Sequence, residues 1–434
     1  MPETSGSDHA MGPGAPARDG DGGAPAAQGD LALVLSGGGA RGAYQTGVLR
    51  CLARNLPGLR FSIVTGVSAG AINAAFVAAH PGSPAEATAE LCHFWAGLRV
   101  EDIFRVDTAS LARHFTRWAT RLASGSVAIA PAVRGLVDTR PLYETIQRAA
   151  ATVDGEIIGI ERNLQRGRLK AFALTGLNYT TGQTVTWVQA RDFQPWDQPR
   201  YRSVQARLTV EHVMASASLP LFFPAVRLGD AWYGDGGVRL STPLAPALRL
   251  GASRILAVSP HYEPTFAEAE RPKSHGYPPP AQILGHLVDS IFLDVLDEDV
   301  RRLKSLNRLL AKLPPEERGH LRKVDIRVLR PSQDLGFLAS DYEPRLPASF
   351  RYLVRSLGTR ETNTNDFLSM VMFQPDFLQK LIEIGEADAE ARLDDIRELV
   401  EGPADSAALA AQPHPLPPGP SPLVPLPEGE GKKS

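Results

Sequence analysis

The chain has 434 residues, which is enough for one large α/β domain or two ordinary domains with a sizeable core. Hydrophobic residues make up 43% and charged residues 22%, the balance of an ordinary globular protein. The formal net charge of −2 gives no support to a nucleic-acid partner, and two cysteines exclude a disulfide framework and fit a reducing compartment.

The first 29 residues are rich in Gly, Ala, Pro and Asp and lack the apolar region of a secretory signal. We therefore expect a disordered leader over residues 1–29. The longest stretch without a charge, residues 61–85, is full of small residues that favour a helix packed in a protein interior over one facing lipid. We expect no transmembrane helix and a cytoplasmic protein that contacts the membrane peripherally.

The first predicted element is a buried strand at 31–35, which leads into the Gly-rich turn 36–39. Helical spacing of apolar residues follows up to residue 56, and a second strand at 61–65 precedes a small-residue helix. This alternation of strand and helix predicts a parallel sheet with right-handed crossovers. Further strands are predicted at 170–175, 184–188, 231–233, 254–259 and 324–329.

The remaining segments are predicted mainly as helices. Residues 86–165 look helical, 262–280 form an exposed loop, and 283–313 show apolar residues at helical spacing. Acidic residues crowd the first half of 283–313, so we expect this helix to pack on the sheet rather than on a membrane. The predicted organisation is a catalytic domain over 30–260, a mostly helical part over 261–402 packed on the same domain, and a Pro-rich disordered tail over 403–434.

The Gly-rich turn from Gly37 to Gly42 follows a strand and opens a helix, so it matches the dinucleotide fingerprint G-x-G-x-x-G. That fingerprint needs an acidic residue about 20 positions further on to hold the ribose, and no Asp or Glu occurs from Leu31 to Ala85. The same turn also suits an oxyanion hole, because consecutive glycines let backbone N–H groups point into one space at a helix N-terminus. A turn that only joins the strand to the helix is the third interpretation.

A single G-x-S-x-G pattern occurs in the chain, Gly66-Val67-Ser68-Ala69-Gly70, where the second strand passes into a helix. A nucleophilic serine needs this setting, since it must sit on a sharp turn with its hydroxyl exposed. The pattern therefore makes Ser68 the candidate nucleophile, against the alternative of a small-residue turn packed for close helix–sheet contact.

A serine nucleophile needs a base, and two candidates follow it in the chain. His261 closely follows the strand at 254–259 and is the one downstream histidine with an informative position for a triad. Asp235 stands in Tyr233-Gly234-Asp235-Gly236-Gly237, after a short strand. Asp-Gly alone is a common turn signal, so the interpretation depends on what precedes it.

Four blocks give the chain its resemblance to the patatin-like phospholipase family. They are Gly37–Gly42, Gly66–Gly70, Ala215–Val226 and Asp235–Gly237, in the order of the family, and they frame residues 31–245. The resemblance implies a three-layer α/β/α sandwich around a mostly parallel sheet, and a Ser–Asp dyad without a catalytic histidine. Residues 323–401 also look like bacterial members, with less specific motifs.

The resemblance also implies the roles of individual residues. It assigns the nucleophile to Ser68, the base to Asp235, and the oxyanion hole to the backbone amides of Gly37, Gly38 and Gly39. Arg41 beside this loop either binds lipid phosphate or supports the loop, and loop support is the favoured role. We interpret Ser216 and Ser218 as structural packing around the site.

The expected function is hydrolysis of fatty-acyl esters in phospholipids, lysophospholipids or glycerides. A Ser-His-Asp esterase that uses His261 and a lipid-binding module without turnover are the alternatives. No metal or cofactor motif is present, since the chain lacks a recognisable acidic calcium loop. The expected partner is the lipid substrate, without nucleic acid, and nothing in the sequence indicates an oligomeric state.

Overall fold

The computed structural model describes residues 30–105, 116, 135–150, 152–270, 277–292, 294–360 and 365–401. The leader predicted at 1–29 and the tail predicted at 403–434 lie outside these residues.

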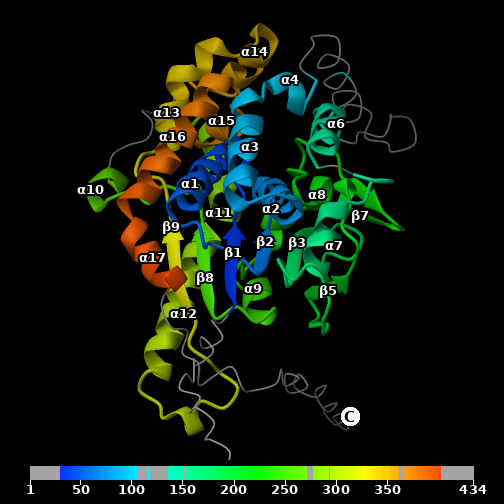
Figure 1. Cartoon of the computed structure of the whole chain (residues 1–434). Coiled ribbons are helices and arrows are strands. Elements are labelled where there is room, and N and C mark those ends of the chain that lie inside the picture. Colours follow the sequence, from blue (N-terminus) through cyan, green and yellow to red (C-terminus); the bar gives the residue numbers. More distant parts are fainter. Residues whose placement is uncertain are drawn as a thin grey trace, which may run out of the picture.

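A mixed, mostly parallel sheet forms the centre of the molecule (Figure 1). Its main strands follow the order β5-β4-β3-β2-β1-β8-β9, and the short strand β7 pairs with β3 on one side and with β6 on the other. The bounds are β1 Leu31–Leu35, β2 Ile63–Gly66, β3 Ala171–Asn178, β4 Thr184–Ala190, β5 Tyr201–Gln205, β6 Val226–Leu228, β7 Ala231–Asp235, β8 Arg254–Val258 and β9 Asp325–Leu329.

Two strands share one edge of β3. Strand β2 pairs with β3 in parallel from Ile63 to Gly66, and the antiparallel strand β7 then pairs with the end of β3, with Asp235 opposite Gly176. Strand β4 occupies the other edge of β3. The end of β7 therefore lies where β2 has just left the sheet.

Helices cover both faces of the sheet, which gives a three-layer α/β/α sandwich (Figure 1). The helices in chain order are α1 Gly42–Asn55, α2 Ala69–Ala79, α3 Pro84–Gly97, α4 Val100–Ile103, α6 Arg140–Ala149, α7 Ile158–Gln165, α8 Val210–Ser216, α9 Ala245–Arg249, α10 Phe266–Ala269, α11 Pro280–Phe292, α12 Asp294–Leu310, α13 Leu335–Tyr342, α14 Ala348–Ser356, α15 Asp366–Val371, α16 Pro375–Ala391 and α17 Leu393–Glu401. Short 3-10 helices lie at η1 Gly39–Arg41, η2 Gly236–Arg239, η3 Pro315–Glu317 and η4 Glu343–Arg345.

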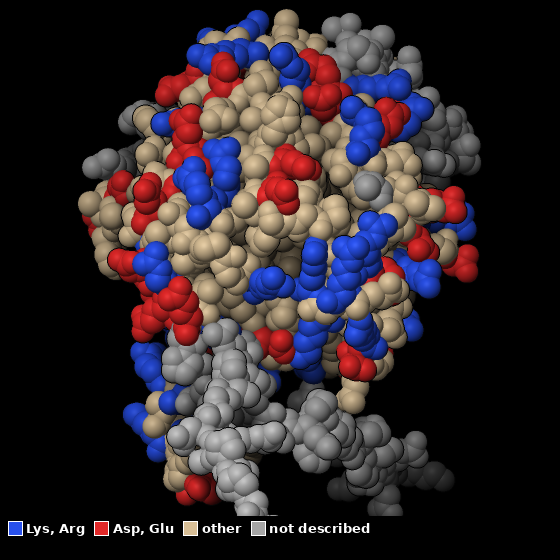
Figure 2. All heavy atoms as spheres, in the orientation of Figure 1, with Lys and Arg blue, Asp and Glu red and all other residues tan. Residues whose placement is uncertain are grey.

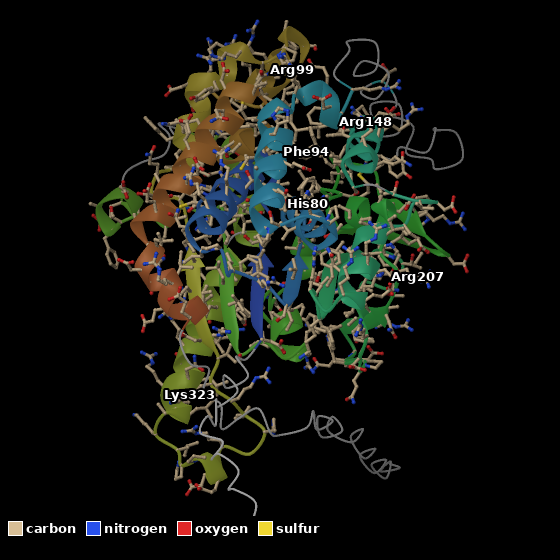
Figure 3. All side chains as sticks on the ribbon, in the orientation of Figure 1. His80, Phe94, Arg99, Arg148, Arg207 and Lys323 are labelled. Atoms are coloured by element: carbon tan, nitrogen blue, oxygen red, sulfur yellow. The ribbon has the colours of Figure 1, made fainter. Side chains whose placement is uncertain are left out.

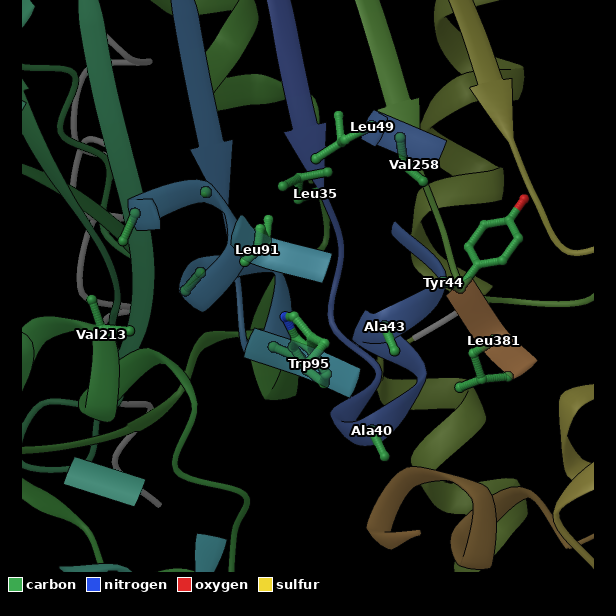
Figure 4. Packing of buried hydrophobic residues seen from close by; sticks show 14 of the residues in the cluster. Leu35, Ala40, Ala43, Tyr44, Leu49, Leu91, Trp95, Val213, Val258 and Leu381 are labelled. Atoms are coloured by element: carbon green, nitrogen blue, oxygen red, sulfur yellow. The ribbon is translucent and has the colours of Figure 1, made fainter. Parts of the chain in front are cut away.

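Strand β1 is buried on both faces, which explains why its sequence does not alternate between apolar and polar residues. Leu31, Leu33 and Leu35 face the layer of α1, α2, α3 and α16, whereas Ala32 and Val34 face the layer of α9 and α12. A strand buried on both faces reads as continuous apolar sequence. Figure 4 shows Leu35 within the first of these layers, which also holds Leu49, Val258 and Leu91.

Helices α1 and α16 come unusually close because each places a glycine against the backbone of the other. A Cβ added at Gly47 would lie 2.0 Å from the carbonyl oxygen of Ile382, and one at Gly385 would lie 2.2 Å from that of Tyr44. Such distances are far below van der Waals contact, so only glycine fits at either position. Helix α16, near the end of the described chain, is therefore built into the core that α1 begins.

The strand predictions correspond to β1, β2, β3, β4, β7, β8 and β9, and two strands were missed. Strand β5 lies at the sheet edge with mixed burial, and β6 has only three residues, so neither carries a clear alternation. The helical spacing at 283–313 corresponds to two helices, α11 and α12. Of the helices in the described ranges, none combines the length and the apolar character needed to cross a membrane.

We predict that Gly47→Ala destabilises the protein by about 1–3 kcal/mol, because overpacking at the α1–α16 crossing outweighs the gain of up to about 1 kcal/mol that alanine brings to a helix. Urea unfolding measures this difference. The matched control is Gly97→Ala in α3, where an added Cβ meets no atom within 4 Å. Equal stabilities for the two variants would contradict the close crossing.

Candidate active site

Ser68 lies directly after β2, on a strained turn into α2. The ends of β1 and β2 are neighbours, with Leu35 opposite Gly66, so the glycine turn and Ser68 leave the sheet side by side. The backbone of Ser68 has φ 57° and ψ −131°, in the left-handed half of conformational space that non-glycine residues avoid. Strain of this kind persists only where the surroundings impose it.

The two glycines of the G-x-S-x-G pattern make this turn possible. A Cβ added at Gly66 would lie 2.5 Å from the carbonyl oxygen of Gly70, and one at Gly70 would lie 2.3 Å from that of Leu35. The helix therefore starts almost in contact with the ends of β1 and β2. Ala69 is the first residue of α2, so its N–H has no partner within the helix.

The glycine turn has an equally constrained backbone. Gly38 has φ 154° and Gly39 has φ 57°, and a Cβ on either residue would collide with Pro260 or with the carbonyl of Met370. Within the described ranges, the backbone N–H groups of Gly37, Gly38 and Gly39 donate to no protein acceptor. These N–H groups are thus available to an external acceptor.

Asp235 ends β7 and is completely buried. Its Oδ1 accepts a hydrogen bond of 2.9 Å from the N–H of Gly237, whereas no donor in the described part of the chain makes a hydrogen bond of good geometry to Oδ2. Burial raises the pKa of Asp235 to about 7, against the opposing effects of the nearby Ser68 hydroxyl and the Gly237 amide. The carboxyl is therefore a far better base than an exposed Asp.

The end of α8 and the two residues after it, Ser216–Ser218, hold Ser68 and Asp235 in place. The N–H of Ser68 donates to both the carbonyl and the hydroxyl oxygen of Ser216, each at 3.2 Å, and the N–H of Asp235 donates to the carbonyl of Ser218 at 2.9 Å. The Ser216 hydroxyl in turn donates to the carbonyl of Thr175 on β3 at 2.7 Å. Ser216 and Ser218, which we expected to be packing residues, thus connect the two candidate catalytic residues.

An apolar pocket opens onto Ser68 and encloses about 630 Å³ of space, its open mouth included. Figure 3 shows one of its residues, Phe94, on α3 between His80 and Arg99. The lining consists of Gly39, Ser68, Ala69, Ile72, Phe94, Trp95, Leu98, Ile103, Leu142, Ala217, Leu219, Phe222, Phe223, Met370, Val371 and Phe373. Gly39 is thus one of the lining residues, whereas Gly37, Gly38 and Asp235 are not among them.

Arg41 is buried and bound to helix α15, and it is not among the residues that line the pocket. Its Nε donates to the Ser369 hydroxyl at 2.6 Å, and one terminal nitrogen donates to Asp366 Oδ1 at 2.8 Å. Asp289 on α11 lies 3.9 Å from the other terminal nitrogen. These acidic partners neutralise the guanidinium, which leaves little of its charge for a lipid phosphate.

His261 lies at the same edge of the sheet as Ser68 but is absent from the pocket lining. It follows β8, which is two strands from β2, and two strand spacings amount to about 10 Å. Its N–H donates to the Ser259 hydroxyl at 3.3 Å.

A buried polar network beneath the pocket went unnoticed in the sequence. The indole N–H of Trp95 donates to Asn73 at 2.6 Å, the Asn73 amide donates to Gln45 at 2.9 Å, and the Gln45 amide donates to the carbonyl of Ser36 at 2.8 Å. The network links the pocket wall to the start of the glycine turn. Isolated Asn and Gln residues inside two helices gave no motif by which to find it.

No cluster of three or more His, Cys, Asp or Glu side chains in the described segments has the arrangement to hold a metal ion.

We predict that Asp235→Asn raises the melting temperature, and that the gain is larger at pH 8 than at pH 5. A carboxyl whose pKa is raised by folding supplies stability below its unfolded pKa of about 4 and loses it as pH rises through about 7. An uncharged amide avoids that loss, and each kcal/mol corresponds to about 2–4 °C. Thermal unfolding at both pH values measures the gain, and an equal gain at both would contradict the raised pKa.

Comparison with known proteins points to one family. Residues 33–248 match the model of the family described as patatin-like phospholipase, whereas no curated protein matches the sequence. The structure of human GIVD cytosolic phospholipase A2 in complex with methyl gamma-linolenyl fluorophosphonate is similar at 12% identity and a TM-score of 0.41, with 88% of this chain and 60% of that chain covered.

Two bacterial structures are also similar. VipD from Legionella pneumophila has 13% identity and a TM-score of 0.29, with 88% of this chain and 78% of that chain covered. The heterodimeric complex ExoU-SpcU from the type III secretion system of Pseudomonas aeruginosa gives 18% identity and a TM-score of 0.27, with 88% of this chain and 74% of that chain covered. These values are low, so the assignment rests on the family model. Through residues 33–248, the chain belongs to the patatin-like phospholipase family.

Proposed function

We propose that this protein is a serine hydrolase that cleaves fatty-acyl ester bonds with a dyad of Ser68 and Asp235. The observation that carries the proposal is a fully buried carboxyl with a raised pKa beside a strained serine that opens onto an apolar pocket. A perturbed pKa at the bottom of a cleft is typical of a functional site. The family assignment to lipid hydrolases agrees with this chemistry.

In the proposed mechanism, the Ser68 hydroxyl attacks the ester carbonyl while Asp235 takes its proton. The negative charge that develops on the carbonyl oxygen is stabilised by the N–H groups of Gly37, Gly38 and Gly39, and each such donor typically contributes about 3 kcal/mol. The ester C–O bond breaks, and Asp235 passes the proton to the leaving alcohol. Water, deprotonated by Asp235, then releases the acyl chain, and the proton returns to Ser68.

The apolar lining of the pocket supports a fatty-acyl chain as the group that binds there. We propose phospholipids, lysophospholipids or glycerides as substrates and a peripheral contact with the lipid surface. On the face shown in Figure 2, Lys and Arg gather at the lower right, whereas acidic and basic side chains alternate elsewhere. The acyl chain itself carries no charge, so in this proposal it binds in the apolar pocket and not on this basic patch.

Two rival functions make different predictions. An esterase with His261 in a triad needs this side chain within hydrogen-bonding reach of Ser68. The two strand spacings that separate β8 from β2, about 10 Å together, argue against it. A lipid-binding module without turnover needs the pocket but neither the strain at Ser68 nor the buried charge at Asp235. Both features cost stability, and a purely binding role gives no reason for either.

We predict that Ser68→Ala and Asp235→Asn each lower hydrolysis of a nitrophenyl ester and a fluorescent phospholipid by at least about a thousandfold, whereas His261→Ala remains within about threefold of the unaltered protein. Initial rates for the four proteins, with folding checked by circular dichroism, provide the test. Loss of activity in His261→Ala would support the triad instead. An inert unaltered protein would support the binding module.

The pH profile offers a second test of the base. Only the ionised carboxylate accepts the serine proton, so we predict that kcat/KM rises about tenfold per pH unit up to an apparent pKa of about 7 and is level above it. Rates on a neutral nitrophenyl ester from pH 5 to pH 9 measure the profile. A plateau that extends down to pH 5 would contradict Asp235 as a base with a raised pKa.

A further inference from the structure

We propose that the segment from Met370 to Phe373 is the specificity-determining wall of the acyl pocket, set in place by Arg41. The segment lies beyond residue 248, where the family match ends, so the family model says nothing about it. This inference rests on the proposed function and names the part of the chain that selects the acyl group.

The first observation is the position of the segment. Met370, Val371 and Phe373 line the same pocket as Ser68, although more than 300 positions separate them in the chain. All three side chains are buried and apolar. The segment therefore supplies part of a pocket whose other lining residues, such as Leu142 and Phe222, belong to the matched domain.

The second observation is the contact between this wall and the glycine turn. A Cβ added at Gly39 would lie 2.3 Å from the carbonyl oxygen of Met370, so the two backbones touch. Phe373, at the other end of the segment, stacks on Trp95 with 6.5 Å between the ring centroids. The wall is thus fixed at one end to the proposed oxyanion hole and at the other to α3.

The third observation is the set of bonds that hold the segment. Arg41 follows the glycine turn directly, and it donates to the Ser369 hydroxyl at 2.6 Å, to Asp366 Oδ1 at 2.8 Å and to the carbonyl of Asp366 at 3.2 Å. The Ser369 hydroxyl also donates to that carbonyl at 2.7 Å. One buried guanidinium therefore connects the turn to the helix that carries the wall, which makes Arg41 a positioning residue.

These contacts predict a dependence on acyl-chain length. A short acyl group fills little of the pocket beside Ser68, whereas a long chain covers more of the apolar lining, and we infer that this includes Phe373. Loss of that ring should lower the rate on long chains and leave short chains nearly unchanged. A role of Phe373 in folding alone would instead lower both rates by one factor.

The test measures kcat/KM of the full chain on nitrophenyl butyrate and nitrophenyl palmitate. We predict that Phe373→Ala lowers the palmitate-to-butyrate ratio about tenfold, that Phe373→Leu lowers it less, and that Arg41→Lys lowers it too because lysine lacks the planar fork. Phe266→Ala is the matched control, since this phenylalanine is 94% exposed on α10 and its loss should leave the ratio unchanged. An unchanged ratio in Phe373→Leu and Arg41→Lys would overturn the inference, even if Phe373→Ala does not fold.

A binding experiment separates this inference from the proposed function. In Ser68→Ala protein, which lacks the nucleophile, we expect a fluorescent sixteen-carbon fatty acid to bind, and Ser68→Ala/Phe373→Leu to bind it more weakly. If the unaltered protein hydrolyses no ester but this difference in binding is found, the proposed hydrolase activity is refuted and the proposed role of Phe373 in acyl binding is supported. If hydrolysis depends on Ser68 but the two proteins bind the fatty acid equally, the proposed role of Phe373 in acyl binding is refuted and the proposed hydrolase activity is supported.

Discussion

Two backbone hydrogen bonds, both accepted by the segment Ser216–Ser218, fix where Ser68 and Asp235 lie relative to each other. Ser216 receives the N–H of Ser68, and Ser218 receives the N–H of Asp235, so residues 167 positions apart are fixed to the same three-residue support. The sheet provides the frame, because β7 reaches β3 where β2 ends. The proposed dyad needs this rigidity, since it has no third residue to orient the base.

The site contains two features that are unfavourable for folding, a strained backbone and a buried carboxyl. Ser68 has an unfavourable backbone conformation, and Asp235 keeps a carboxyl in an apolar interior with only one oxygen well bonded. Each feature lowers stability, and the packed layers around the sheet must offset both. Such local violations are expected where function, not folding, selects the residue. The same burial that destabilises the folded protein gives the carboxyl its basicity.

The sequence was informative wherever the signal was local. The glycine turn and the G-x-S-x-G pattern each lie within six residues, and both occur at strand-to-helix junctions as predicted. The parallel core followed from the alternation of strand and helix. Which strand ends meet was beyond the reach of such patterns, because the place of β7 beside β3 depends on pairing between segments 55 or more residues apart.

The contacts of Arg41 could not be predicted from the sequence either. Its partners lie 325 and 328 positions away, and neither Asp366 nor Ser369 stands in a recognisable motif. Loop support was favoured for Arg41 from its position next to the glycines, but the structure adds that its partners come from a helix outside residues 33–248, which match the family model. The Trp95–Asn73–Gln45 network was missed for the same reason, since the sequence does not distinguish a buried amide side chain from an exposed one.

The crossing of α1 and α16 has a consequence for synthesis on the ribosome. Helix α1 emerges early with an apolar face, and the helix that covers it follows roughly 330 residues later, a delay of about 15–70 s at 5–20 residues per second. Over that interval the nascent chain exposes the surface that holds Gly47 and Tyr44. During translation there is therefore a period in which chaperones and proteases can bind this surface of α1 before α16 covers it.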